Sequence, residues 1–333
     1  MTLTQLNAFV LVARLGSVTA AANALGVSEP AVSQALTALR QHLGDQLVSR
    51  GPSGMTLTAG GSRLLATASQ IVVLGAEAHA QVRAAQGAPE QLRVVASPTV
   101  AEFVTTPLIE AFTKRFATGL EVTSGVAVTK EMAVLIANRL ADVAIGPDVA
   151  VGQGQIRQTQ QVRSADFSPQ NALPVVSEPI FKYRLVVVAG GHAKPRGGAH
   201  QWRWLVGPSA TDPDSDVGQF LAKLRIPEDR MGVCPSQTAA LAAVADGNGV
   251  SVAVEHLVAQ QVRRGELSLV EVPGSPGQGC WYATLLERQQ RSAVASSLRR
   301  FLSTPEAMQL MRSPAAGVPP SRFRPPVYVT IWS

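Results

Sequence analysis

Polar side chains that form hydrogen bonds recur at the starts of short helical segments within the first sixty residues. Hydroxyls and free N–H groups at a helix start suit phosphate oxygens, and Ser17, Thr19 and Ser28 hold such positions. Gln34 could pair with adenine in a bidentate manner, and Glu29 could accept a hydrogen bond from a cytosine amino group. Ser17 and Ser28 could instead act only as helix caps. These residue types allow nucleic-acid contact if the fold presents them together.

Three short helices are expected to position these side chains. Apolar residues follow helical spacing in the first, which ends at Gly16. A second, alanine-rich helix covers 18–25, and a third extends from Ser28 to Gly44 with Pro30 in its first turn. The expected buried side of the third helix is Ala31, Leu36, Leu39 and Leu43. The short second helix, tight turn and longer third helix have the proportions of a helix-turn-helix.

Two strand-like runs follow, 47–50 and 55–58, around the turn-forming residues 51–54. This pattern predicts a β-hairpin, which would form the wing of a winged helix-turn-helix. The third helix of such a domain enters the major groove of DNA through its N-terminal part.

Many residues of this region, in order, resemble the N-terminal domain of the LysR-type transcriptional regulators. The matching positions are Phe9, Ala13, Gly16, Ser17, Ala21, Ala22, Leu25, Val27, Ser28, Pro30, Ala31, Val32, Ser33, Leu39, Leu43, Gly44, Leu47, Arg50, Leu57 and Thr58. Glu29, Gln34 and Arg40 depart from the family, which usually carries Gln, Arg and Glu there. The resemblance implies DNA binding, and these departures prevent transfer of a base preference.

The resemblance and the helix-turn-helix geometry together imply a set of DNA contacts. The expected DNA-binding residues are Ser17, Thr19, Ser28, Glu29, Pro30, Ser33, Gln34, Thr37, Arg50 and Ser53. Ser33 and Gln34 are favoured as direct contacts, and Arg50 and Ser53 would touch phosphate or the minor groove from the wing. Arg40 is expected to be solvated or ion-paired rather than to read bases.

Residues 60–86 lack proline and predict one long helix of about 39 Å at 1.5 Å per residue. Apolar or small residues alternate at spacings of four and three, typical of a two-helix coiled coil. They are Leu64, Ala68, Ile71, Gly75, Ala78 and Val82. We expect this stripe to be too long for the small N-terminal domain to bury, and the resemblance implies a linker helix that pairs two subunits. The alternative is packing on the chain's own body.

From residue 91 the pattern changes to alternating strands and helices. The first set is expected as strands 92–96, 120–128 and 141–145 with helices 100–116 and 130–140. The second is expected as strands 183–189, 204–207 and 250–254 with helices 217–224 and 238–246. This order predicts an α/β fold with parallel strands. It resembles the effector domain of the same family, two α/β lobes like those of a periplasmic binding protein, joined by strands that would cross near 175–178 and 270–279.

Ligands of open α/β sheets bind beyond the carboxyl ends of the strands. There, Ser97, Pro98 and Thr99 begin one helix and Thr129 precedes the next, so hydroxyls and free N–H groups could hold a carboxylate or similar anion. From the other lobe, Ser209, Thr211, Ser236 and Thr238 could face the same cleft. Ordinary helix capping is the alternative for each of these residues. Asp212, Asp214 and Asp216 would favour the dipole of the helix they precede, and could make that side unfavourable for anionic effectors.

The expected organisation is therefore a multidomain α/β chain. It comprises a winged helix-turn-helix over 1–58, a linker helix over 59–88, an effector domain over 89–303 and a proline-rich tail over 304–333. The first lobe would combine 91–174 with 281–303, and the second would cover 179–272. Residues 149–175 are expected as a surface excursion, and 327–332 as an apolar terminal strand that docks within the protein rather than forming a free tail.

Charge and composition restrict the function less than the motifs do. The net charge is +6, yet residues 1–60 hold three Arg against one Glu and one Asp, whereas 287–333 hold seven Arg against two Glu. The expected DNA binding therefore does not rest on charge. No apolar run is long enough to span a membrane, no secretory signal is apparent, and two cysteines are too few for a disulfide framework. A cytoplasmic protein is expected.

Other functions have weaker support. The sequence shows no phosphate loop, zinc-ligand spacing or nucleophile elbow, so neither an enzyme nor a cofactor or metal site is expected. A transport-type solute binder fits the body but not the N-terminal domain. A thiol redox sensor would need Cys234 and Cys280 to meet, and each is more readily interpreted as a small buried hydrophobe.

The resemblance implies a regulator that forms a homodimer and assembles further into a tetramer. It would bind double-stranded promoter DNA at an interrupted inverted repeat and act on RNA polymerase. A small-molecule effector, such as a metabolite, would bind between the lobes and change their relative orientation, and through the linker helices the spacing of the DNA-binding domains.

Overall fold

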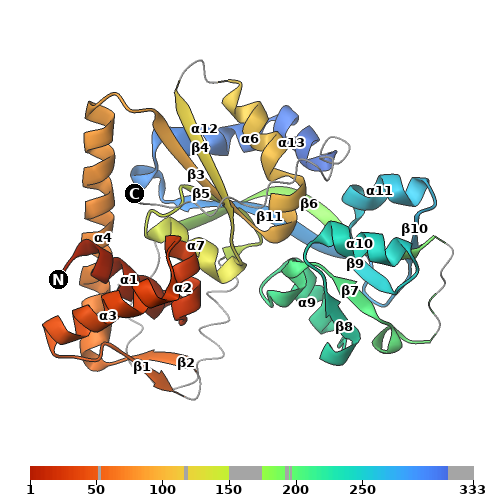
Figure 1. Ribbon diagram of the computed structural model, residues 1–333. Coiled ribbons are helices and arrows are strands. Elements are labelled where there is room, and N and C mark those ends of the chain that lie inside the picture. Colours follow the sequence, from red (N-terminus) through yellow and green to blue (C-terminus); the bar gives the residue numbers. More distant parts are fainter. Residues whose placement is uncertain (52–53, 116–118, 150–174, 192–194, 196, 314–333) are drawn as a thin grey trace.

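The computed structural model describes residues 1–51, 54–115, 119–149, 175–191, 195 and 197–313. A small helical domain with a hairpin lies beside a long helix at one side of the molecule (Figure 1). An elongated α/β body extends away from that helix, with its second half at the opposite side (Figure 1). Among the described helices, none is long and apolar enough to cross a membrane.

The N-terminal domain has the predicted three helices and hairpin. Helices α1 (Leu3–Leu15), α2 (Val18–Leu25) and α3 (Glu29–Leu43) precede strands β1 (Val48–Gly51) and β2 (Gly54–Leu57), which pair antiparallel. Each helix ends at a glycine in the left-handed conformation, Gly16, Gly26 and Gly44, with φ of 68°, 66° and 67°. A residue without a Cβ takes this conformation without steric cost, so each helix stops where the sequence predicted.

The buried side of α3 differs from the prediction. Val32, Leu36 and Leu39 are its buried residues, whereas Ala31 is exposed and Leu43 retains 41% of its surface. Ala31 lies about 100° around the helix from Val32 and so faces away from the other helices. Leu43 is on the buried side, but it lies in the last turn, next to Gly44, where solvent reaches it. The prediction was therefore wrong at both ends of the helix.

Helix α4 (Ala59–Ala85) is a continuous 27-residue helix, as predicted. Leu65, Ala68 and Val72 of its first half are buried in the N-terminal core, because α1 packs along this part of the helix. The expectation that this domain could not bury the helix is thus wrong for the first half. In the second half Leu74 and Val82 are 62% and 57% exposed.

The body contains a nine-stranded sheet in the described residues, with two parallel sets of strands. Its strands are β3 (Glu90–Ala96), β4 (Leu120–Val126), β5 (Val143–Gly146), β6 (Val175–Gly190), β7 (Trp204–Val206), β8 (Met231–Val233), β9 (Val250–Val254), β10 (Leu267–Val270) and β11 (Gly277–Leu286). Strand β3 lies parallel to β4 and β5 in the first lobe, and β7 lies parallel to β8 and β9 in the second. Strands β6 and β11 are antiparallel to each other and join the lobes, so the sheet as a whole is mixed.

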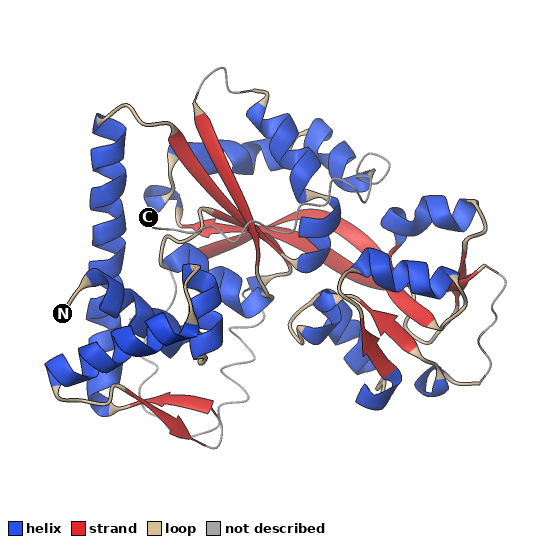
Figure 2. Cartoon of the chain, viewed as in Figure 1, coloured by secondary structure: helices blue, strands red, loops and turns tan. Residues whose placement is uncertain are grey.

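Helices lie on both sides of these strands (Figure 2). They are α5 (Pro98–Phe103), α6 (Thr105–Thr113), α7 (Thr129–Ala137), α9 (Asp216–Lys223), α10 (Gln237–Ala245), α11 (Glu255–Arg263), α12 (Ala293–Leu302) and α13 (Pro305–Arg312). The single helix predicted over 100–116 is two helices, α5 and α6, with a break at Val104. The ring of Pro107 would clash with the carbonyl of residue 103 in one continuous helix.

Two further features of the body differ from the sequence interpretation. Residues 305–312 form α13, which packs on α6 through buried Ala307 and Met311, so the predicted tail does not start at 304. Thr304 caps this helix and Pro305 opens it, a local signal that the prediction overlooked. The predicted excursion over 149–175 and terminal strand over 327–332 fall, apart from Val149 and Val175, outside the described residues.

The lobes exchange strands slightly later than predicted. Residues 175–178 of β6 still pair with the end of β11 in the first lobe, whereas 185–189 pair with β9 in the second. Between them Phe181 stacks on Trp281, with ring centroids 5.4 Å apart, and Tyr183 contacts the same indole at 4.9 Å. Bulky rings can fill the centre of the crossing because both strands are covered there. This exchange lies within the strands rather than at their ends.

The N-terminal domain also rests on the first lobe. Val134 of α7 is buried in the same apolar cluster as the residues of α1. Arg139, which follows α7, forms an ion pair of 2.5 Å with Glu77 of α4. Helix α7 is thereby in contact with both the DNA-binding part of the chain and the effector-domain sheet.

Leu39→Ala is expected to lower the free energy of unfolding of the N-terminal domain by about 2–5 kcal/mol, because it leaves a cavity in a closed core. Leu43→Ala, an identical change on the same helix at a half-exposed position, is expected to cost about 1 kcal/mol or less. Urea denaturation of the full chain, followed by far-ultraviolet circular dichroism, measures both. Equal losses for the two variants would show that the buried side of α3 is misassigned.

Candidate nucleic-acid interface and interlobe site

The polar side chains predicted on α3 share one exposed surface. Glu29, Ser33 and Thr37 follow each other at four-residue spacing, and Pro30 and Gln34 lie beside them. All five are exposed, and the Thr37 hydroxyl donates to the Ser33 carbonyl at 2.9 Å. The N-terminal half of α3 therefore presents hydrogen-bonding groups on a regular helix, as a helix that enters the major groove requires.

The serines at the helix starts have the capping role that was the alternative to DNA contact. Ser17 accepts a hydrogen bond from the Ala20 N–H at 3.2 Å, and Ser28 accepts one from the Ala31 N–H at 3.4 Å. Each hydroxyl still has its own hydrogen to donate, so capping does not prevent a phosphate contact. Thr19 is exposed beside Ser17.

The wing is tied to α3 by a residue whose role was misjudged. Arg40 was expected to be solvated or ion-paired, but its Nε donates to the Gln46 carbonyl at 2.8 Å and its guanidinium to the Val48 carbonyl at 3.0 Å. Carbonyls this distant in sequence give no local signal. Arg50 is exposed on β1, as a phosphate contact would need, and Ser53 lies outside the described residues.

Asp45, which the sequence analysis did not single out, holds the other end of the hairpin. Its carboxylate accepts from the Leu47 N–H at 2.6 Å and from the Thr58 hydroxyl at 2.8 Å. These two hydrogen bonds, the backbone one first, lower the pKa of the Asp45 carboxyl. Because Thr58 also caps α4, Asp45 connects the wing to the linker helix.

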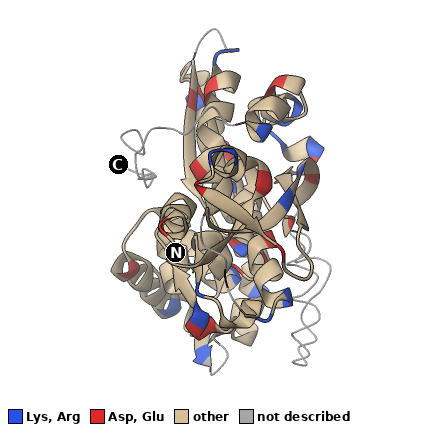
Figure 3. Ribbon diagram, turned by 90° about the vertical axis from the view of Figure 1, so that its right-hand side faces the viewer, with Lys and Arg blue, Asp and Glu red and all other residues tan. Residues whose placement is uncertain are grey.

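Charge does not mark the interface. Lys, Arg, Asp and Glu are interspersed along the described ribbon (Figure 3). Shape and hydrogen-bonding groups of the helix-turn-helix, rather than a basic patch, identify the surface.

In the body, the predicted effector residues meet across the two lobes. The Thr99 hydroxyl lies 2.9 Å from the Ser209 hydroxyl, so α5 of the first lobe contacts the turn after β7 of the second. Ser97 and Ser209 are both buried. The structure thus brings two residues from distant segments together at one junction, and their contact with an effector stays a prediction.

Thr129 has a partner that the prediction did not foresee. Its N–H and its hydroxyl both donate to Oδ2 of Asp212, at 2.8 and 2.7 Å. Asp212 belongs to the second lobe and had been interpreted as favouring its own lobe's helix dipole. Thr129 is 1% exposed and Asp212 is 5% exposed, so this contact is shielded from water.

A second carboxylate crosses the junction in the other direction. Glu102 of α5 accepts from the N–H groups of Gln237 and Thr238 at 2.9 and 2.7 Å, at the start of α10. Glu102 was missed because nothing near it in sequence indicates which helix it faces. The Ser236 side chain caps α10 by accepting from Ala239, and the exposed Thr211 donates to the Pro208 carbonyl of its own turn.

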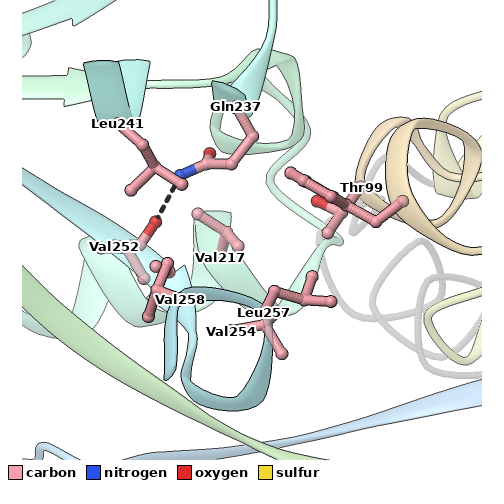
Figure 4. A pocket seen from close by; sticks show the side chains of 10 residues that line it. Thr99, Val217, Gln237, Leu241, Val252, Val254, Leu257 and Val258 are labelled. Atoms are coloured by element: carbon pink, nitrogen blue, oxygen red, sulfur yellow. Dashed lines mark hydrogen bonds between the residues drawn. The ribbon is translucent and has the colours of Figure 1, made fainter. Parts of the chain in front are cut away.

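Little space remains next to these contacts. A cavity of about 10 Å³ lies between Thr99, Val217 and Leu257, with Gln237 donating to the Val252 carbonyl beside it at 2.9 Å (Figure 4). This volume holds about one water molecule at most. A ligand therefore cannot bind there in the present arrangement.

A larger pocket of about 610 Å³ opens at the strand crossing. Asp148 of the first lobe, Lys182 of β6, and Asp214 and Asp216 of the second lobe line it, together with Tyr282. The Tyr183 hydroxyl donates to Asp216 at 2.5 Å, and the Cys280 N–H donates to the same oxygen at 3.2 Å. The described residues contain no group of three or more His, Cys, Asp or Glu suited to hold a metal ion.

Burial changes the acidity of this lining. It raises the pKa of the Asp216 carboxyl, against the hydrogen bonds from Tyr183 and Cys280, which lower it. It also raises the pKa of Asp214, and the nearby charge of Asp212 adds to this effect. The pKa of the Cys280 thiol is raised as well, first by burial. A raised pKa disfavours the thiolate that a reactive redox cysteine needs.

Two family models match this chain. Residues 3–62 match the bacterial regulatory helix-turn-helix protein model of the lysR family, and residues 166–304 match the LysR substrate binding domain. An uncharacterized HTH-type transcriptional regulator of Mycobacterium tuberculosis strain H37Rv is 35% identical over 340 residues, which cover 100% of both chains. The chain belongs to the LysR family of transcriptional regulators. Like other members, this LysR-type regulator is a DNA-binding protein with an effector-binding domain.

More distant relatives agree with this assignment. The HTH-type transcriptional regulator CfxR of Cupriavidus necator is 25% identical over 314 residues, covering 91% of each chain. Among solved structures, a full-length AphB variant aligns with a TM-score of 0.54 at 17% identity, covering 91% of this chain and 98% of that one. A full-length OxyR variant from Pseudomonas aeruginosa aligns with a TM-score of 0.51 at 18% identity and the same coverage. These structures show the shared fold.

Arg40→Ala in this regulator is expected to weaken binding to specific and non-specific DNA alike by about tenfold, because the wing loses two charge-assisted hydrogen bonds to α3. Arg40→Lys is expected to weaken binding almost as much, since an ammonium group lacks the planar fork that reaches both carbonyls. Fluorescence anisotropy with labelled duplexes measures both variants. Wild-type affinity in the Lys variant would instead assign Arg40 a role through charge alone.

Proposed function

We propose that this LysR-type regulator reads its operator through the N-terminal half of α3. The observation that carries this proposal is the shared exposed surface of Glu29, Ser33, Gln34 and Thr37. Gln34 would pair with adenine, and Glu29 would accept from a cytosine amino group. Ser17, Thr19, Ser28, Pro30, Arg50 and Ser53 would complete the contacts to the backbone and the minor groove.

We further propose that the regulator acts as a homodimer, assembled into a tetramer, on an interrupted inverted repeat. The exposed Leu74 and Val82 in the second half of α4 support pairing through this helix, because apolar groups on an isolated helix surface favour a partner. The two DNA-binding domains of a dimer, related by symmetry, would each bind one half-site of the repeat. The regulator would act in the cytoplasm and contact RNA polymerase there.

The chain divides, on this proposal, into a DNA-binding domain over 1–58, a linker helix over 59–88 and an effector domain from 89. Since α13 packs on α6, the effector domain extends through Arg312 rather than ending at 303. Its first lobe includes α12 and α13, and its second covers 179–272.

The effector would bind between the lobes. The pocket of about 610 Å³ at the strand crossing supports this location, because ligand pockets usually measure about 300–1,000 Å³. The Thr99–Ser209 and Thr129–Asp212 contacts between the lobes lie outside the lining of this pocket. The proposed effector contacts from the two lobes are Ser97, Pro98, Thr99, Thr129, Ser209, Thr211, Ser236 and Thr238. A ligand that favours another lobe orientation would shift α7, and through Val134 the helix-turn-helix.

A redox-sensing function has less support. Cys234 and Cys280 are both free thiols in the structure. Burial raises the pKa of Cys280, which disfavours the thiolate needed for fast oxidation.

Gln34→Ala is expected to weaken binding to the DNA upstream of the regulator's own gene by about tenfold, through loss of one bidentate base contact. Fluorescence anisotropy with excess non-specific competitor, repeated across salt concentrations, measures the effect. Binding should fall steeply with salt, since phosphate contacts release counterions. Gln70→Ala is the matched control, because it removes the same side chain from an exposed position of α4.

Equal affinity of the Gln34 variant and wild type would refute the proposed role of Gln34. If the upstream DNA is not bound specifically, selection of bound fragments from genomic DNA replaces it as the probe. A selection without any enriched sequence would refute sequence-specific reading by α3.

A further inference from the structure

Two carboxylates of this chain occupy the N-termini of two helices, each from the opposite lobe. Asp212 of the second lobe holds the start of α7 through the N–H and hydroxyl of Thr129, at 2.8 and 2.7 Å. Glu102 of the first lobe holds the start of α10 through the N–H groups of Gln237 and Thr238. Both helices have nine residues, so each has a complete N-terminal turn of backbone N–H donors.

The Asp212 contact has the features of a bound anion rather than of a salt bridge. Among the ion pairs of the described residues, none involves Asp212 or Glu102. The negative charge is held by a backbone N–H, a hydroxyl and the positive end of a helix, which together also bind carboxylate ligands. The other oxygen of Asp212 accepts from the Asp214 N–H at 3.1 Å, which fixes the carboxylate plane.

We infer that Asp212 is a built-in carboxylate that fills the anion position of the interlobe cleft and determines effector specificity. Thr129 was the position where hydroxyl and N–H groups predicted an anion site, and the chain itself supplies the anion. This inference rests on the proposed function, an effector bound between the lobes. An effector of this regulator is not anchored through a carboxylate at Thr129.

The remaining space also disfavours an anion. Asp148, Asp214 and Asp216 line the pocket at the strand crossing, with Lys182 and Arg184 as its basic residues. Arg184 is 3.4 Å from Glu255, so part of its charge is already neutralised. Acidic side chains thus outnumber basic ones in this lining, which disfavours an anionic effector.

Asp212 also lies at the start of the helix that touches the DNA-binding domain. Thr129 begins α7, and Val134, five residues later, is buried in the cluster formed with α1. The carboxylate therefore connects the start of α7 to the second lobe. Removal of the Asp212 carboxylate should therefore destabilise the packing of both lobes.

The experiment replaces the built-in carboxylate with a free one. Full-length wild type, Asp212→Ala and the control Asp229→Ala are compared in sodium formate and in sodium chloride at equal ionic strength. Asp229 is a matched control because it is an aspartate of the same lobe whose side chain is 77% exposed. Thermal unfolding gives the midpoint in each salt, and methylammonium chloride tests whether a cation has the same effect.

Asp212→Ala is expected to unfold at a lower temperature than wild type in chloride, and formate should recover about 2–4 °C of that loss by binding at Thr129. The thermal unfolding midpoint of wild type should be the same in formate as in chloride, and the same holds for Asp229→Ala. In both proteins Asp212 already occupies the anion position at Thr129. Methylammonium should recover nothing. Absence of a formate effect in Asp212→Ala, or an equal effect in wild type, would overturn the inference.

Asp212→Asn keeps the inference testable if the alanine variant does not fold. The amide preserves the shape but carries no charge, so hydrogen exchange at the Thr129 amide should be about tenfold faster than in wild type. Unchanged exchange would overturn the inference. None of these readouts uses DNA or an effector. Failure of every small molecule to alter operator binding would refute the proposed function and leave the result on Asp212 intact.

Discussion

The antiparallel pairing of β6 with β11 is the constraint on which the rest of the effector domain depends. Its register runs from Gly277 opposite Leu185 to Leu286 opposite Val175, and it places both lobes in one sheet. The parallel strands of each lobe then point their carboxyl ends at the junction, where helices α7 and α10 begin. The register shifts by one residue between Trp281 and Tyr282, and at this irregularity the Trp281 ring packs on Phe181 and Tyr183.

This arrangement creates a particular electrostatic problem at the junction. Two helix N-termini meet the opposite lobe with unsatisfied N–H groups, and burial without partners would be costly. Asp212 and Glu102 supply partners for these N–H groups from opposite lobes, and the Thr99 and Ser209 hydroxyls add a further contact between the lobes. The same contacts that satisfy the helix ends therefore hold the lobes together. Helix α7 contacts the second lobe at its start and the N-terminal core at Val134. The orientation of the lobes and the position of the DNA-binding domain are therefore linked through this one helix.

The N-terminal domain is organised by much more local interactions. Glycines end its three helices, and Ser17 and Ser28 cap the next helix a residue or two later. Two side chains then make longer connections. Arg40 binds carbonyls of the segment leading into β1, and Asp45 joins the wing to Thr58 at the start of the linker helix. The hydrogen bonds of Arg40 and Asp45 thus connect α3 through the wing to α4. A movement of the linker helix would therefore also move the DNA-binding surface of α3.

The sequence by itself determined the order and the ends of the three N-terminal helices and the exposed polar surface of α3, because capping and amphipathic periodicity act over a few residues. It also located Thr99, Ser209 and Thr129 near one junction, since the ends of parallel strands must gather there. It misjudged Leu43, which lies in the solvent-exposed last turn of α3, and Arg40, whose partners depend on how the wing folds back onto α3. The helix at 305–312 was missed although Thr304 and Pro305 mark its start. Only the tertiary structure decided that Asp212, 83 residues after Thr129, occupies its anion position. The residues next to an aspartate in the sequence do not show which distant N–H group its carboxylate will bind. That partner is decided by how the two lobes pack against each other.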